Sequence, residues 1–395
     1  GDLSLPNMAY LCMLHSKIPH GYVKAVHAEK ALALPGVYGV YHCLNTTDRK
    51  YNRYRSNFDQ SYLPNEECAF NDYVRFVGDK IGVVAACDQE TAERAARLVE
   101  VEYEELPFSI GFDDTLAGKN CLDGETPVRD EYELDVGEKQ GSAEGLIEVC
   151  STMELPRLHH ATMETHACIA DYDPYGDMLT VYCPNQAVHG IRTVLADFLE
   201  MPESHVRVVK ATMGGSFGAK QEWFLEPVTA LVAKKLCRPV KLVYSRGEAM
   251  TDTIVRGAMR MSARGYYTPD GEMKEIYCDV TLDAGAYIGN AGDYVRALAG
   301  KPTRCYRIPY MHYHGQIISS NSPVSGAFRS WSAAEEALMM ERQLDAAAEK
   351  LGMDRLAIRL KNVARSGEED KKLHLSLEDI RIGDAITLGR EKFGW

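Results

Sequence analysis

Long apolar runs, closely spaced cysteines and an excess of positive charge are all missing from this sequence. No stretch approaches the roughly 18 consecutive apolar residues of a membrane-spanning helix, and no signal peptide is visible. The formal charge of −13 argues against nucleic acid or an anionic membrane as a partner. The 395 residues, 45% of them hydrophobic, are instead enough for two or three domains with buried cores.

The cysteines indicate a reducing compartment. Eleven of them are scattered singly from Cys12 to Cys305, without a C-x-x-C pair or the spacing of a zinc ribbon. We therefore expect a cytoplasmic protein that uses cysteine as a small core residue, and no iron–sulfur cluster held by this chain alone. The chain starts at Gly1, without an initiator methionine, so we expect an upstream segment to be missing.

Alternating strand-like and helix-like segments predict an α/β fold of mixed α+β type. We expect a small α/β domain over 1–108, a linker rich in glycine and proline over 109–144, and a larger α/β domain over 145–395. Strands are expected at 80–87, 177–183, 205–211 and 239–245, and helices at 88–99, 188–198 and 332–352.

Three helix ends have recognisable signals. Asp88 and Asn185 precede two of the helices as expected N-caps. Ser332 and Glu335 have the spacing of a capping box at the start of the last helix, and Gly352 follows its end.

Residues 211–223, ATMGGSFGAKQEW, place three glycines around a single aromatic residue, Phe217. Glycine permits positive φ and close approach, and successive amides in such a turn form a concave donor site for anions. Because the loop matches neither a Walker A loop nor G-x-G-x-x-G, phosphate binding and a plain tight turn both stay open.

Three further motifs carry polar groups with more than one interpretation. In GAFRSWSAAEE, Arg329 either presents its guanidinium to an oxyanion or is a surface arginine beside core aromatics. HHATMETHA contains three histidines and Glu164 but lacks H-E-x-x-H, so core histidines are favoured over a metal site. Gln186 lies at a strand-to-helix junction, the edge of a sheet where ligands bind.

Taken in order and at these separations, the motifs HHATMETHACIA, PNQ, GGSFGAK and GAFRSW resemble the molybdenum-binding subunit of the xanthine dehydrogenase and aldehyde oxidase family. The resemblance covers nearly the whole chain. Residues 1–108 resemble that family's small α/β hammerhead domain, from GDLSLPNMAY to VEVEYEELP, and 145–395 resemble the first half of its molybdopterin-binding region.

The resemblance implies a molybdenum–molybdopterin cofactor, for which we expect the cytosine dinucleotide form. Its implied activity is hydroxylation of a purine, another N-heteroaromatic such as nicotinate, or an aldehyde, with oxygen from water. The implied catalytic residues are Gln186, Phe217 and Arg329; the implied cofactor contacts are Gln186, Gly215, Ser216, Phe217, Gly218 and Arg329. No side chain is expected to ligate the metal directly.

Some positions depart from the family's pattern and concern the substrate. Gln221 stands where purine-oxidising relatives have glutamate, and Trp331 where they have phenylalanine. Arg296 matches their substrate-binding arginine except for a shift of one position. Ser216 and Ala219 replace glycines of the family loop. We expect Gln221, Arg296 and Trp331 to contact the substrate.

The family's general-base glutamate and the second half of its cofactor region have no counterpart in this chain. The resemblance therefore implies a second molybdopterin-binding subunit or C-terminal half, an iron–sulfur subunit and an FAD subunit as partners. Two alternatives stay open: an assembly subunit that keeps the fold without the cofactor, and an unrelated phosphate-binding α/β enzyme.

Overall fold

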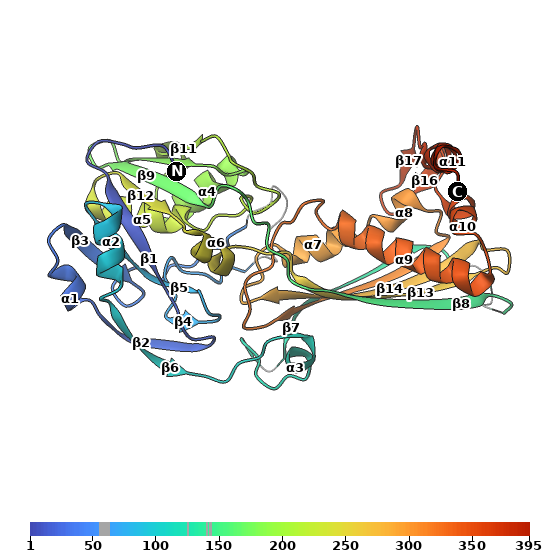
Figure 1. Ribbon diagram of the computed structural model, residues 1–395, viewed down its shortest axis with the longest axis horizontal. Coiled ribbons are helices and arrows are strands. Elements are labelled where there is room, and N and C mark those ends of the chain that lie inside the picture. Colours follow the sequence, from blue (N-terminus) through green and yellow to red (C-terminus); the bar gives the residue numbers. More distant parts are fainter. Residues whose placement is uncertain (55–63, 125, 140, 142–143) are drawn as a thin grey trace.

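A computed structural model describes residues 1–54, 64–124, 126–139, 141 and 144–395. Figure 1 shows two lobes along the longest axis, one built around a seven-stranded sheet and the other around a long five-stranded sheet. The predicted α/β fold with mixed α+β character is confirmed. Within the described ranges, no helix combines the length and the apolar character needed to cross a membrane.

The first lobe joins strands from the N-terminal part and the middle of the sequence in one sheet. β1 pairs in parallel with β12, so the N-terminal strands and those after residue 167 share a core. In spatial order the sheet consists of β11 (Val206–Lys210), β10 (Met178–Cys183), β9 (Ala167–Asp173), β12 (Val240–Val243), β1 (Ala9–His15), β5 (Lys80–Ala86) and β3 (Val37–His42). A small second sheet contains β4 (Tyr73–Val74), β2 (Gly21–His27) and β6 (Glu100–Glu105).

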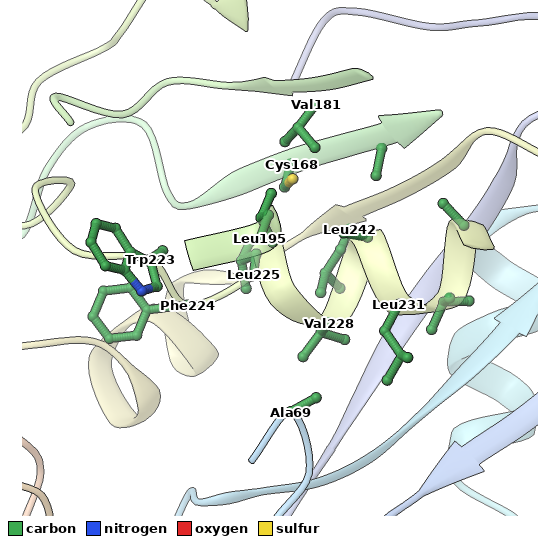
Figure 2. Packing of buried hydrophobic residues seen from close by; sticks show 14 of the residues in the cluster. Ala69, Cys168, Val181, Leu195, Trp223, Phe224, Leu225, Val228, Leu231 and Leu242 are labelled. Atoms are coloured by element: carbon green, nitrogen blue, oxygen red, sulfur yellow. The ribbon is translucent and has the colours of Figure 1, made fainter. Parts of the chain in front are cut away.

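Helices cover both faces of the seven-stranded sheet, because side chains along its strands alternate between two apolar clusters. Figure 2 shows Val228 and Leu231 of α5, and Leu225 just before it, in the same apolar cluster as Cys168 and Leu242 of the strands. On the other face, Ala95 of α2 packs with Val84. The helices of this lobe are α1 (Glu29–Leu32), α2 (Gln89–Ala96), α4 (Val188–Phe198), α5 (Glu226–Leu236) and α6 (Arg246–Asp252), with a short 3-10 turn at Glu203–His205.

The second lobe packs α9 against one face of the five-stranded sheet (Figure 1). The sheet order is β7 (Val128–Gly137), β15 (Tyr310–Ser319), β14 (Met273–Gly285), β13 (Ala258–Tyr267) and β8 (Ile147–Leu155). The other elements are α3 (Phe112–Leu116), α7 (Ala291–Leu298), α8 (Pro302–Cys305), α9 (Ala333–Leu351), α10 (Arg355–Asn362), β16 (Glu368–Asp370), β17 (Leu375–Leu377) and α11 (Ile382–Phe393).

The linker prediction over 109–144 is wrong for 128–137. That segment is β7, an edge strand paired with β15 along its length. Tyr132, Leu134 and Val136 alternate with charged residues and point their side chains toward the core of this lobe. Charged residues on the open face hid this alternation from the sequence analysis.

Two of the predicted caps are also wrong in detail. Asp88 caps α2 as expected and accepts from Thr91 N at 2.7 Å. In contrast, Ser332 precedes α9 with φ of 63° and makes no side-chain cap, because its hydroxyl donates to Trp331 O. Asn185 lies outside α4 and accepts from Ala187 N, leaving its amide nitrogen to donate to Glu222 O.

Buried charges lie where the two lobes meet. The Arg53 guanidinium forms two hydrogen bonds with Glu67, and both side chains are 2% exposed. Arg53 also lies over the Phe224 ring of the first lobe and the Tyr287 ring of the second. Lys80 Nζ is 3.6 Å from both Glu67 and Asp252. A buried ion pair therefore lies at the junction, against aromatic rings from both lobes.

Removing one member of this pair is expected to cost more than removing both. Arg53→Met leaves the Glu67 carboxylate buried without its bidentate partner and is expected to lower the free energy of unfolding by about 3–5 kcal/mol. The double variant Arg53→Met/Glu67→Leu is expected to recover much of that loss, as measured by urea unfolding. A single variant as stable as the original chain would contradict this account.

Candidate functional site

The glycine loop follows β11 and has the backbone shape of an anion-binding turn. Gly215, Phe217 and Gly218 have φ of 93°, 55° and 103°. A positive φ is unusual for phenylalanine, which marks Phe217 as a residue that the surrounding structure holds in place. Among the described residues, the amides of 215–218 donate to no other group. They form a short row of available donors.

The loop lies directly against the segment that contains Arg329. A Cβ atom at Gly218 would be 2.5 Å from Ala327 O and 3.0 Å from Phe328 Cα. No side chain fits in that space, so glycine is required both by φ and by this close approach. The contact joins the backbone next to Phe217 to the segment that leads to Arg329, although 112 positions separate these two residues in the sequence.

The histidine-rich motif positions these two loops. His160 Nε2 donates to Ala327 O at 2.8 Å, and His166 Nε2 donates to Ala219 O at 2.9 Å. Glu164 accepts from Gly214 N at 2.9 Å and from Lys220 Nζ at 2.6 Å. In the part of the chain that the structure describes, no three His, Cys, Asp or Glu side chains gather as a metal site.

Burial keeps the two histidines neutral. It lowers the pKa of the His160 and His166 imidazoles from 6.5 to about 4. Each ring therefore stays a neutral donor to a loop carbonyl near neutral pH. The lysine of the loop, Lys220, is only 1% exposed and is paired with Glu164.

The expected catalytic residues are exposed to solvent. Gln186, Phe217 and Arg329 are all exposed, Phe217 by 51%. Ser216 donates its hydroxyl to Gln186 Oε1, so the glycine loop and the strand-to-helix junction are in direct contact. A cavity of about 480 Å³ begins before the loop, at Glu164 and Thr212, but Gln186, Arg329 and residues 214–221 do not line it.

The three expected substrate contacts lie in different surroundings. Gln221 is half-buried and donates its backbone N–H to Gly218 O, so it belongs to the glycine loop. The Trp331 ring packs between Tyr54 and Tyr294. Arg296 lies on α7 and is paired with Asp130 of β7 at 2.9 Å, so its described contacts are in the five-stranded sheet.

The sequence analysis missed three buried polar residues next to the glycine loop and the Arg329 segment. Glu222, Lys220 and Asn290 are 0 to 1% exposed, which is rare for such side chains. Only the unusual run Lys-Gln-Glu before an apolar helix hinted at them. The roles of His160 and His166 followed from no local pattern, because their acceptors are carbonyls more than fifty positions away.

These features fit a bulky cofactor that carries polar oxygens. The row of free amides at 215–218, the absence of Cβ atoms at Gly215 and Gly218, and the exposed Arg329 guanidinium all suit an anionic or oxo-bearing group. The loops therefore define a cofactor-binding protein of the α/β class.

Comparison with known proteins gives the family. Residues 127–363 match the molybdopterin cofactor-binding domain, and residues 1–107 match the a/b hammerhead domain of aldehyde oxidase and xanthine dehydrogenase. The chain belongs to this molybdenum hydroxylase family and is a molybdopterin-binding subunit of it; the resemblance drawn from the motifs is confirmed. Named members of the family are dehydrogenases and oxidoreductases.

Curated relatives differ in length. The nicotinate dehydrogenase large molybdopterin subunit of Eubacterium barkeri is 29% identical over 99% of this chain and 91% of its own length. The xanthine dehydrogenase molybdenum-binding subunit of Escherichia coli O157:H7 is 29% identical over 100% of this chain and 53% of its own. The carbon monoxide dehydrogenase large chain of Hydrogenophaga pseudoflava is 32% identical over 92% of this chain and 48% of its own. The chain thus spans about half the length of the latter two.

A solved structure confirms the fold. The aldehyde oxidoreductase of Desulfovibrio gigas superposes with a TM-score of 0.90 over 99% of this chain and 44% of its own, at 24% identity. At this identity the likeness concerns the fold alone.

The buried histidines predict how stability depends on pH. Unfolded histidine binds a proton near pH 6.5, whereas His160 and His166 do so only near pH 4. Stability is therefore expected to fall as pH drops below 6.5, by about 1.4 kcal/mol per pH unit for each histidine. His166→Gln is expected to reduce this slope in urea unfolding between pH 7.0 and 5.5. An unchanged slope would contradict the assignment.

Proposed function

We propose that this chain binds a molybdenum–molybdopterin cofactor in a hydroxylase that oxidises a purine, another N-heteroaromatic such as nicotinate, or an aldehyde. The observation that carries the proposal is the row of free amides at 215–218 held against the Arg329 segment. The family membership and the nicotinate and xanthine dehydrogenase names of relatives support it. We expect the cytosine dinucleotide form of the cofactor.

Within that site, the chain's residues bind and orient. The amides of 215–218 would donate hydrogen bonds to polar oxygens, and the Gln186 amide nitrogen would add a donor from the strand-to-helix junction. Arg329 would supply positive charge beside negative oxygens, and the Phe217 ring would exclude water from one side. When bound, a molybdenum–pterin cofactor accepts two electrons from a substrate carbon that gains oxygen from water.

An open site needs other chains. Gln186, Phe217 and Arg329 face solvent here, so the opposite wall would come from a second molybdopterin-binding subunit or C-terminal half. That partner would also provide the general base. Electrons would leave through iron–sulfur and FAD subunits. We keep 1–108 as the hammerhead domain and 145–395 as the first cofactor-binding domain, and a cytoplasmic location agrees with eleven unpaired cysteines.

Elemental analysis tests the proposal directly. The complex with its partner subunits is expected to contain molybdenum and a pterin, because the loops fit such a group. Arg329→Ala is expected to abolish turnover or cofactor retention with little loss of stability, since this side chain is exposed.

The matched control is Arg365→Ala, an exposed arginine after α10. It is expected to keep both turnover and metal content. A wild-type complex without molybdenum and pterin, as an assembly subunit would be, refutes the proposal.

The glycine-loop position Gln221 is expected to influence substrate choice. Gln221→Glu places an acceptor-only carboxylate at the end of the loop and should shift relative kcat/KM values among purines, nicotinate and aldehydes. Gln89→Glu on α2 is the control and should leave the ratios unchanged. Identical substrate profiles for both variants would remove Gln221 from the site.

A further inference from the structure

Glu222 is a fully buried carboxyl directly after the glycine loop. Its side chain is 0% exposed. Oε1 accepts from Ala327 N at 3.3 Å and from Asn290 Nδ2 at 2.7 Å. One acidic side chain thus joins the end of the glycine loop to the segment that leads to Arg329.

The surrounding backbone leaves room for this carboxyl. A Cβ atom at Gly326 would lie only 2.5 Å from Glu222 Oε1, which is closer than a Cβ contact can be. Gly326 does not have a positive φ, so its backbone conformation does not require glycine. Glycine is required there because the Glu222 and Ile254 side chains occupy the space of a Cβ atom.

The backbone of Glu222 adds a third connection. Asn185 Nδ2 donates to Glu222 O at 2.8 Å, and Asn185 precedes Gln186. The same residue therefore contacts the segments that carry Gln186 and Arg329 and is itself part of the loop that carries Phe217. The three expected catalytic residues come from three distant segments, and Glu222 is in contact with all three segments.

We infer that Glu222 is a positioning residue which sets the separation of the glycine loop, Gln186 and the Arg329 segment. The inference rests on the proposed function for its catalytic consequence. Glu222 acts through these loops and not by contact with substrate.

The carboxyl acts as a neutral acceptor. Burial raises the pKa of Glu222 to about 8, against the opposing effect of the Arg53 guanidinium. The Arg53 guanidinium donates two hydrogen bonds to Glu67, so its positive charge is shared between Glu67 and Glu222. A glutamine at position 222 would have the same length and an oxygen that accepts the same two hydrogen bonds.

The chain offers a matched control in Glu226. This second buried carboxyl lies four positions later and accepts from Phe224 N at 3.0 Å, where α5 begins. Glu226 is the first residue of α5, and among the described residues it contacts neither the Arg329 segment nor Asn290. Loss of Glu226 therefore reports on stability without a change in loop separation.

The test measures kcat, KM and molybdenum content in the enzyme assembled with its partner subunits. Glu222→Gln is expected to keep kcat within about twofold. Glu222→Asp, one methylene shorter, is expected to lower kcat per molybdenum about a hundredfold because the loops shift by about an ångström. KM is expected to change by less than about threefold, because no substrate contact is lost. Glu226→Asp is expected to lower Tm and keep kcat per molybdenum.

Amide hydrogen exchange of the full chain gives a second readout that needs no cofactor. Glu222→Asp is expected to speed exchange in both 214–221 and 326–332, and Glu226→Asp is expected to leave both unchanged. Unchanged exchange in Glu222→Asp, equal losses of kcat per molybdenum for both aspartate variants, or a Gln variant as impaired as the Asp variant would each overturn the inference. A wild-type complex without molybdenum would refute the proposed function and leave the exchange result to decide on Glu222.

Discussion

The close backbone contact between Gly218 and Ala327 determines the geometry of the site. At 2.5 Å from a hypothetical Cβ to a carbonyl oxygen, nothing larger than glycine fits between the loops. Two segments over a hundred positions apart in the sequence are thereby brought into contact. The backbone of the glycine loop thereby lies against the segment that leads to Arg329.

Around this contact, the structure uses neutral buried groups where charges would be costly. His160 and His166 donate to carbonyls on the two sides of the contact, and Glu222 accepts from the backbone beyond it. Desolvation disfavours the charged form of each group, which leaves their hydrogen bonds as the useful interaction. Hydrogen bonds from neutral side chains to backbone atoms thus hold the two loops in place.

Much of the fold was predictable from local pattern. The apolar run at 80–87 became β5, the amphipathic segment after Asp88 became α2, and Gly352 ends α9. The predictions that failed did so for different reasons. Ser332 forms no capping box since its hydroxyl bonds to Trp331 O, and Lys301 donates to that same hydroxyl. The linker prediction failed at β7 because five of the ten residues of this strand are charged, which masks its three core-facing residues.

By itself, the sequence determined several of the strands and helices, among them β5, α2 and α9, because periodicity is a property of neighbouring residues. The tertiary structure alone decided which loop carbonyls His160 and His166 bond, that Arg296 pairs with Asp130, and that burial raises the pKa of Glu222. Those outcomes depend on burial and on partners far away in the chain. Desolvation and long-range contacts exist only once the two lobes have packed.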